Sequence, residues 1–215
     1  MKLPSFKYEK NLWKKGKNLV CGIDEVGRGS WAGPVVSAAV IFDQNIRITF
    51  NDVGLSRVRD SKTTAPKERE KLSEIIKKQA LAYSISEIGV KRINKHGIGK
   101  CSQYAFRKAL KKLKVRPDHI LIDAFYIKYL KRKSQNAIVK GDEKCFSIAA
   151  ASIIAKVYRD NLMKKLGKRF PKYRFDLHKG YGTLLHQKSI EKYGLCKIHR
   201  TSFKILAGKE KSEEI

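Results

Sequence analysis

Two adjacent carboxylates, Asp24 and Glu25, follow a short apolar segment near the start of the chain, and a glycine-flanked arginine, Gly27-Arg28-Gly29, comes directly after them. The apolar segment has the composition of a buried strand, so the carboxylates lie at the edge of a core. A metal ion is a natural partner for buried negative charge, and the glycines let the backbone approach a ligand closely. A solvated strand end is the ordinary alternative for an isolated Asp-Glu pair.

Two further aspartates follow apolar segments later in the chain. Segment 119–122 ends at Asp123, and segment 137–139 comes shortly before Asp142. Because the carboxyl ends of parallel strands meet at one edge of a sheet, we expect these aspartates to converge with the first pair. Clustered carboxylates raise one another's pKa and suit hard divalent cations such as Mg²⁺ or Mn²⁺. Taken singly, each aspartate could equally be a turn residue.

The elements that would position these residues alternate between strand and helix patterns, which favours an α/β fold. Segments 35–42 and 82–88 are expected to pair antiparallel with the first strand. Three helices are expected: one capped by Thr64, one over about 100–114, and one capped by Ser147 and stopped by Gly167.

The composition is strongly basic, with 48 Lys and Arg against 20 Asp and Glu, a formal net charge of +28 on 215 residues. Such an excess attracts phosphate chains through counterion release, which makes nucleic acid the natural partner. Part of the charge could instead serve solubility. A basic, non-catalytic nucleic-acid-binding protein would explain the charge equally well, but not three acidic strand ends.

The remaining features place the chain in a broad class. The four cysteines are scattered and indicate neither a zinc site nor a disulfide framework: Cys21, Cys101, Cys145 and Cys196. The N-terminus lacks the apolar stretch of a signal peptide, and no uncharged run approaches membrane-spanning length. We therefore expect a cytoplasmic, monomeric, single-domain protein without membrane association.

Several longer motifs occur in order along nearly the whole chain. They are the segments 24–29, 33–36, 60–62, 121–123, 140–142, 149–160, 178–181 and 199–203. With them the chain resembles type 2 ribonuclease H, which cuts RNA in RNA–DNA hybrids and single ribonucleotides embedded in duplex DNA. The resemblance implies a ribonuclease H-like fold, a five-stranded mixed sheet flanked by helices. It also implies one catalytic domain over 1–215, with a basic extension over about 1–17, a C-terminal helical substrate-binding region over about 168–208 and a frayed tail over 209–215.

The resemblance also assigns the acidic residues. It implies that Asp24, Glu25, Asp123 and Asp142 hold two divalent ions, Mg²⁺ or Mn²⁺, for phosphodiester hydrolysis that leaves a 5′-phosphate and a 3′-hydroxyl. One ion would activate a water and the other would stabilise the leaving oxygen. Neighbouring strand residues point to opposite faces, so Glu25 could ligate through its backbone carbonyl instead of its side chain.

Substrate contacts follow from the same resemblance. Gly27-Arg28-Gly29 is similar to a loop that reads the ribonucleotide 2′-hydroxyl, the group that separates RNA from DNA. Tyr181 resembles a tyrosine that packs on the neighbouring deoxyribose, although a half-buried loop tyrosine is the plainer reading. Phosphate contacts are expected from Lys62, Lys179, Arg200 and Ser202.

Related enzyme classes remain alternatives. Type 3 enzymes share the carboxylates but usually carry an N-terminal binding domain, for which about twenty residues before the first strand leave no room. A ribonuclease H-like transposase or resolvase shares the metal chemistry but gives no reason for a loop that reads a 2′-hydroxyl. Ribonucleotide excision repair and primer removal are the implied roles. The sequence leaves open the preferred metal ion and any sliding-clamp or polymerase partner.

Overall fold

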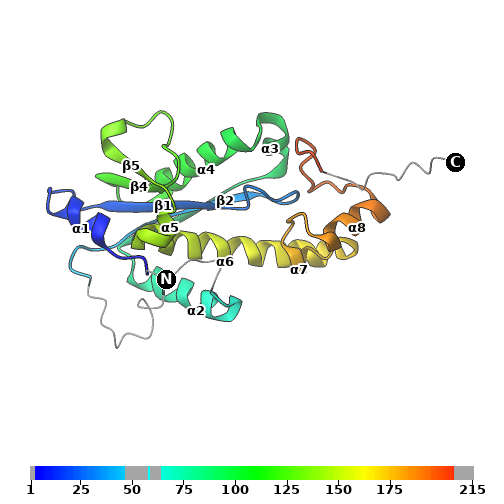
Figure 1. Ribbon diagram of the computed structural model, residues 1–215, viewed down its shortest axis with the longest axis horizontal. Helices are drawn as coiled ribbons and strands as arrows, with labels where there is room; N and C mark the ends of the chain where they lie inside the picture. The colour runs from blue at the N-terminus through cyan, green and yellow to red at the C-terminus, as the bar shows by residue number, and fades with distance from the viewer. Residues whose placement is uncertain (1–2, 47–57, 59–63, 206–215) are drawn as a thin grey trace.

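The computed structural model describes residues 3–46, 58 and 64–205. Its centre is a five-stranded mixed sheet in the order β3-β2-β1-β4-β5 (Figure 1). The strands are β1 (Val20–Val26), β2 (Val35–Ile41), β3 (Ala82–Ile88), β4 (His119–Asp123) and β5 (Gln135–Ile138). Strands β1, β2 and β3 pair antiparallel, whereas β4 and β5 extend the sheet in parallel with β1. The expected α/β fold with a mixed five-stranded sheet is confirmed.

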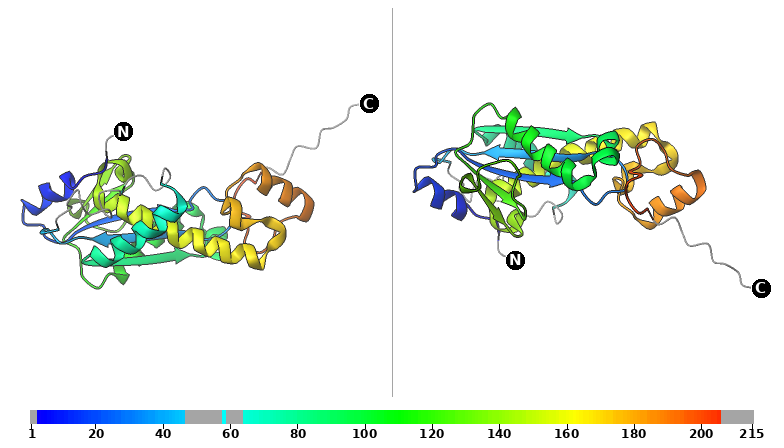
Figure 2. Two further views of the ribbon diagram at one scale, coloured as in Figure 1. Left: turned by 90° about the horizontal axis from the view of Figure 1, so that it is seen from below. Right: turned by 90° about the horizontal axis from the view of Figure 1, so that it is seen from above.

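Helices cover both faces of this sheet (Figure 2). The helices are α1 (Lys7–Trp13), α2 (Pro66–Gln79), α3 (Val90–His96), α4 (Ile98–Lys112), α5 (Gly141–Lys144), α6 (Phe146–Arg169), α7 (Phe175–His178) and α8 (Leu184–Tyr193). Side chains of β2 alternate between the faces: Val36 and Ala38 join the cluster under α6, whereas Ala39 and Ile41 join the cluster under α4. The long helix α6 lies directly against β1, where Gly22 has no room for a side chain beside the backbone of Ser147.

The helix ends differ from the sequence predictions. Helix α2 begins after Ala65 rather than Thr64, and α6 begins after Cys145, so Ser147 lies inside the helix. Instead, Glu9 of α1 reaches the start of α6, where its Oε1 accepts a 2.8 Å hydrogen bond from the Ser147 amide. The cap thus comes from a residue far away in sequence, which local patterns do not reveal.

Gly167 does not end α6, which continues to Arg169. A Cβ at Gly167 would lie 2.7 Å from the Asp176 amide nitrogen, so this glycine allows α7 to pack closely on α6. Helices α7 and α8 follow at the far end of α6 and form the C-terminal region of the described chain (Figures 1 and 2). The expected frayed tail, 209–215, lies outside the described residues.

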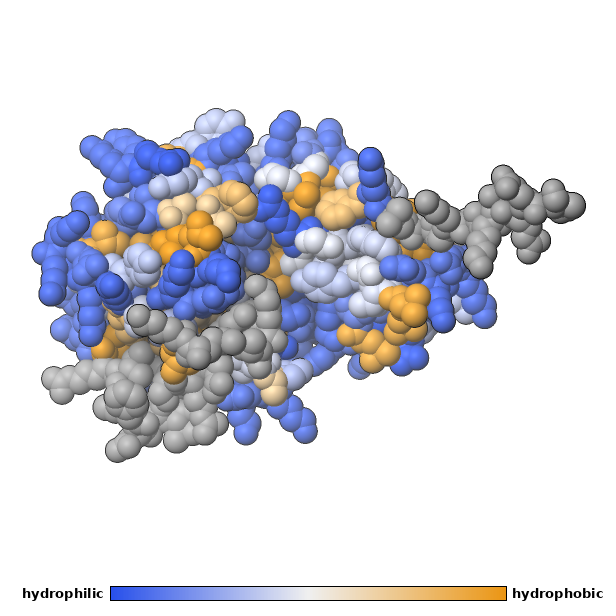
Figure 3. All heavy atoms as spheres, viewed as in Figure 1, coloured by the Kyte–Doolittle hydropathy of each residue, from blue (hydrophilic) through white to orange (hydrophobic). Residues whose placement is uncertain are grey.

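The surface is mostly hydrophilic on the face drawn in Figure 3, with smaller apolar patches. Exposed leucines on the C-terminal helices include Leu177 and Leu184. In the described part of the chain, no helix combines the length and the hydrophobicity needed to cross a bilayer.

Candidate active site

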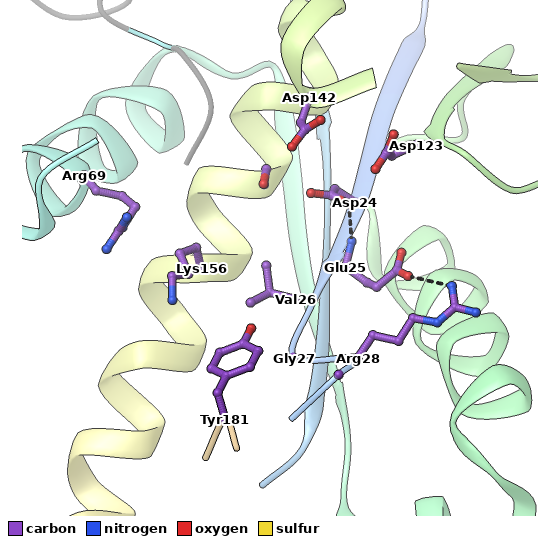
Figure 4. Close-up of a pocket in the computed structure, with 12 residues that line it drawn as sticks. Asp24, Glu25, Val26, Gly27, Arg28, Arg69, Asp123, Asp142, Lys156 and Tyr181 are labelled. Carbon is purple, nitrogen blue, oxygen red and sulfur yellow. Dashed lines mark hydrogen bonds and ion pairs between the residues drawn. The ribbon is translucent and has the colours of Figure 1, made fainter. Parts of the chain in front are cut away.

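A pocket of about 600 Å³ opens at the carboxyl end of the central strands. All four acidic residues expected from the sequence line it: Asp24, Glu25, Asp123 and Asp142. They come from β1, from the end of β4 and from α5, and the three aspartates lie together at one end of the pocket (Figure 4).

The sheet register explains how the aspartates meet. Strands β1 and β4 pair in parallel with Ile23 opposite Ile122, so the next residues, Asp24 and Asp123, lie side by side. The amide of Gly141 donates a 2.7 Å hydrogen bond to Oδ1 of Asp123, which fixes the turn that carries the third aspartate. A Cβ at Gly141 would lie 2.7 Å from the terminal methyl of Ile148 and 3.4 Å from Oδ1 of Asp123, so the glycine eases this close approach.

Burial and mutual repulsion disfavour negative charge in this pocket. Burial, then the charge of Glu25 and that of Asp123, raise the pKa of Asp24 well above its usual range, against a hydrogen bond from Ser152. Burial raises the pKa of Glu25 to about 7, although Arg28 opposes this rise. A cation among these carboxylates would remove the cost of ionising them.

The donor set fits a hard divalent cation, because carboxylate oxygens from three elements line one buried pocket. In the described ranges, no three His, Cys, Asp or Glu side chains already stand in a metal-binding arrangement. The fit therefore rests on the type of donor and on the electrostatics. The residues available to hold Mg²⁺ or Mn²⁺ are Asp24, Glu25, Asp123 and Asp142.

Glu25 points away from the aspartates, toward Arg28 (Figure 4). Arg28 Nη1 and Glu25 Oε1 are 3.5 Å apart, and the guanidinium group of Arg28 lies over the ring of Phe125 at 5.0 Å. The expected alternation of neighbouring strand residues is therefore present. In this arrangement the Glu25 side chain contributes less directly to the aspartate cluster.

Arg200 holds the loop that follows β1. It donates through Nη2 to the Gly27 carbonyl at 2.7 Å and through Nη1 to the Arg28 carbonyl at 2.9 Å, while Nε bonds the Gly33 carbonyl. Arg200 is fully buried. These contacts do not support its interpretation as a phosphate contact, since its donors face the loop backbone.

A second buried arginine, Arg159 of α6, joins this loop to the C-terminal region. Its guanidinium group donates to the carbonyls of Ala32 and Pro34 on one side and of Lys179 on the other, at 3.0–3.2 Å. Gly27 has a φ of +89°, and a Cβ there would overlap the Arg159 side chain. This position therefore requires glycine twice over, for its conformation and for its space.

Tyr181 lies across the pocket from Arg28 (Figure 4). Its ring is 5.9 Å from Nζ of Lys156 and 5.4 Å from the guanidinium carbon of Arg159. The preceding carbonyl, that of Gly180, accepts hydrogen bonds from two amides of the loop after β1. The two segments expected to contact the sugars thus form one connected rim of the acidic pocket.

The protein-family model described as Ribonuclease HII matches residues 21–206 of this chain. The chain belongs to the ribonuclease HII family. The ribonuclease HII of Caldicellulosiruptor bescii is 44% identical over 198 residues, which cover 92% of each protein. The crystal structure of ribonuclease H2 from Pyrococcus horikoshii OT3 matches with a TM-score of 0.69 and 27% identity, covering 86% of this chain and 94% of that one.

A more distant structure shows the same fold. Bst-RNase HIII, solved in complex with Mn²⁺, matches with a TM-score of 0.66 at 19% identity, covering 87% of this chain and 68% of that one.

Membership in the ribonuclease HII family makes this chain a type 2 ribonuclease H, a hydrolase that acts on the RNA strand of RNA–DNA hybrids.

In this ribonuclease HII, two histidines in contact, His199 and His186, hold the backbone of Tyr181; we call them the histidine chain. The Cys196 amide is 2.8 Å from Nδ1 of His199, Nε2 of His199 is 3.0 Å from Nε2 of His186, and Nδ1 of His186 is 3.0 Å from the Tyr181 carbonyl. Because a carbonyl can only accept, Nδ1 of His186 donates to the Tyr181 carbonyl. Nδ1 of His199 lies within reach of both the amide and the carbonyl of Cys196, the carbonyl at 3.2 Å.

His178 also has a structural position. Its Nδ1 accepts from the Gly180 amide at 3.1 Å, and its Nε2 lies 2.7 Å from the Tyr173 carbonyl. Burial lowers the pKa of His178, as it does for His186 and His199. Both ring nitrogens are therefore occupied in holding the segment before Tyr181.

The other expected phosphate contacts have different surroundings. Nζ of Lys179 donates to the carbonyls of Asp176 and Leu177, and Ser202 is exposed beside Asn94. Lys62 lies outside the described residues.

Three pocket residues were not singled out from the sequence: Arg69, Ser152 and Lys156. Ser152 and Lys156 are four residues apart on α6, which places them on one helical face. Their spacing of four residues within segment 149–160 could have indicated that both face the same pocket. Arg69 carried no local signal, because it reaches the pocket only through the packing of α2 on α6.

Proposed function

We propose that this ribonuclease HII cuts duplex DNA on the 5′ side of a single embedded ribonucleotide, in addition to the RNA strand of hybrids, and leaves 5′-phosphate and 3′-hydroxyl ends. One observation carries the proposal: a single pocket is lined by four carboxylates, the Gly27-Arg28-Gly29 loop and Tyr181. The corresponding roles are ribonucleotide excision repair and primer removal.

The carboxylates are assigned to the divalent ions. Asp24, Asp123 and Asp142 would hold them, with Glu25 at the side nearest Arg28. When bound, two such ions supply an activated water and stabilise the charge of the leaving oxygen. Without a cation, burial and mutual repulsion raise the pKa values of Asp24 and Glu25, so a bound cation would stabilise their ionised forms.

The loop after β1 is assigned to the 2′-hydroxyl. Arg200 fixes the carbonyls of Gly27 and Arg28, so the loop backbone is ordered before a substrate arrives. A 2′-hydroxyl both donates and accepts hydrogen bonds, which backbone groups can match within a glycine-rich segment. Recognition of a single ribonucleotide needs such a reader at only one sugar.

Tyr181 is assigned to the neighbouring deoxyribose. Lys156 and Arg159 lie beside the ring, and His186 holds the backbone of Tyr181 through its carbonyl. A flat ring packed on a sugar leaves no room for an added hydroxyl. This arrangement favours an RNA–DNA junction over continuous RNA.

Phosphates are assigned to the cationic side of the pocket. Lys156 and Arg69 line it, and both pair with Asp160, at 2.8 Å and 3.6 Å. The ammonium group of Lys156 suits a phosphate oxygen. Lys62, Lys179 and Ser202 are proposed as further phosphate contacts along the strand.

The test uses an end-labelled DNA duplex that contains one ribonucleotide, incubated with Mg²⁺, with Mn²⁺ and with a chelator. We expect metal-dependent cleavage on the 5′ side of the ribonucleotide and no cleavage of an all-DNA duplex. Cleavage of a hybrid without cleavage at the single ribonucleotide would contradict the proposal. Cleavage of the all-DNA duplex would indicate a transposase-like or resolvase-like activity instead.

A further inference from the structure

A second groove, of about 520 Å³, lies beside the active-site pocket, between α4 and the loop that joins β4 to β5. Arg28 lines both hollows, so they adjoin at this side chain. The proposed mechanism uses no other residue of this groove. We call it the aromatic groove after the rings that line it: Tyr104, Phe106, Phe125, Tyr126 and Tyr129.

Three of these rings are exposed to solvent side by side. Tyr129 is 90% exposed, Phe125 is 54% exposed and Tyr104 is 37% exposed. Folding normally covers aromatic rings, because exposing them forgoes the largest apolar burial that a side chain offers. A group of exposed rings beside a catalytic pocket therefore indicates a binding surface.

Arginines alternate with the rings. The guanidinium carbon of Arg107 lies 5.1 Å from the centre of Tyr104 and 5.3 Å from that of Tyr129, while Arg28 covers Phe125. Each arginine occupies one side of a ring and adds positive charge beside it. A flat, electron-rich ligand that carries negative charge matches this surface.

Two glutamines hold the β4–β5 loop rigidly in place. Gln135, only 4% exposed, accepts from the Ile127 amide at 2.8 Å and donates back to its carbonyl at 3.0 Å. Gln103 of α4 accepts from the Lys128 amide at 2.7 Å and donates to the Tyr126 carbonyl at 3.1 Å. The exposed rings are thus presented by an ordered backbone.

The loop also contains two residues in a backbone conformation that side chains disfavour. Ala124 has a φ of 57° and Tyr129 a φ of 67°. Such residues persist only where the surroundings hold them, and they are frequent at binding sites. The most exposed ring in the loop is therefore also one of its strained positions.

We propose that the aromatic groove binds a single-stranded segment of nucleic acid that continues from the strand in the active-site pocket. Exposed rings stack on unpaired bases, and the arginines between them meet the phosphates, which is how single strands are held without sequence preference. A duplex offers phosphates but not base faces, because its bases are already stacked on one another. The continuity of the strand rests on the proposed function, whereas the binding of a single strand does not.

Binding is tested first, with a fluorescent 12-nucleotide DNA strand and anisotropy as the readout. We expect Tyr129→Ala to weaken binding about tenfold, the loss of one stacked base, and Tyr129→Phe to keep most of the affinity. Tyr83→Ala removes a tyrosine that is 41% exposed on β3, away from the groove, and serves as the matched control. Equal affinities of the wild type and Tyr129→Ala would overturn the proposal.

A second measurement tests the continuity with the active site. Three duplexes carry the same embedded ribonucleotide: one is blunt, and in the other two the ribonucleotide strand continues as a single-stranded tail at its 5′ or its 3′ end. We expect a lower KM for one tailed duplex, and expect Tyr129→Ala to abolish that difference. No effect of either tail would overturn the continuity. Absence of cleavage of the blunt duplex by the wild type would instead refute the proposed function, and the anisotropy result would still stand.

Discussion

Burial and two neighbouring carboxylates disfavour negative charge on Asp24 and raise its pKa well above the usual range. Asp24→Asn removes that repulsion together with a proposed metal ligand. We therefore expect cleavage to fall by orders of magnitude, while the affinity for duplex is kept or increased. In chelator, the unfolding temperature of Asp24→Asn should exceed that of the wild type.

The control for this substitution is Asp43→Asn, which changes an exposed aspartate after β2. It should leave cleavage, binding and the unfolding temperature unchanged. Full activity of Asp24→Asn would show that the carboxylate cluster is not the catalytic centre. Loss of duplex binding together with activity would indicate a purely structural role for Asp24.

The requirement for glycine at position 27 can be tested by a single substitution. Gly27→Ala puts a side chain at a φ of +89° and against Arg159, which is fully buried and cannot move aside. We expect a loss of about 2–4 kcal/mol in the free energy of unfolding, from backbone strain and overpacking together. Gly29→Ala, whose Cβ would meet nothing within 4 Å, should leave urea unfolding unchanged.

Individual residues differed in how far the sequence could define them. The convergence of Asp24, Asp123 and Asp142 could be predicted because each follows an apolar strand segment, and parallel pairing then brings strand ends together. The burial of Arg200 could not be predicted, because a basic residue among polar neighbours carries no sign that it will be buried. Burial depends on what packs around a residue, and the glycine loop that covers Arg200 is more than a hundred and sixty positions away.

At the scale of elements, the start of α6 depends on a different helix. Glu9 of α1 is 1% exposed, and its Oε1 accepts from the Ser147 amide and from the thiol of Cys145. A carboxylate at a helix N-terminus satisfies a free amide and interacts favourably with the helix dipole. Helix α6 carries Ser152, Lys156 and Arg159, so α1 supports the site indirectly.

We expect Glu9→Ala to lower the free energy of unfolding by about 1–2 kcal/mol, which is the typical contribution of a helix cap. For a chain of this size, the unfolding temperature should fall by about 2–8 °C. The control is Glu74→Ala, which removes an exposed glutamate paired with Lys77 on α2 and should change little. Equal effects of the two substitutions would refute the capping role of Glu9.

The same contact explains which element boundaries could be predicted. The strands were found because alternation and β-branched residues are local signals, and β2 and β3 match the expected segments closely. The helix expected over about 100–114 matches α4, Ile98–Lys112. The ends of α6 were not predicted, because Ser147 and Gly167 have the local chemistry of a cap and a stop but lie inside the helix and serve packing. Tertiary contacts override such signals wherever a helix end is buried.

At the scale of the whole molecule, the basic charge and the acidic pocket have separate roles. The excess of +28 acts at long range on any phosphate chain, whereas the carboxylates act only inside one buried pocket. Composition alone could therefore predict the class of partner. Composition could not predict the reaction, because the reaction requires that particular strand ends meet. The longer motifs indicated this arrangement, and the parallel pairing of β1 with β4 explains it.

The junction between the sheet and the C-terminal helices gives the molecule a dependence on pH. Burial, then the proximity of His178, lowers the pKa of His186 to about 4 in the folded protein, against 6.5 as the ordinary value. Between these values the unfolded chain binds more protons, so the free energy of unfolding falls as the pH falls from about 6.5 toward 4. Above pH 6.5 this contribution to stability is complete.

Urea unfolding at a series of pH values checks this prediction, with His186→Asn as the informative variant. The variant should be less stable at pH 7.5, because it loses the bond between His186 and the Tyr181 carbonyl, and its stability should fall less steeply below pH 6.5. Protonation of His186 adds a positive charge to a ring that is buried beside His178 and His199, and this is the cost that the variant removes. An unchanged pH slope in the variant would show that acid acts elsewhere in the molecule and that the histidine chain does not couple the C-terminal helices to the rim of the active site.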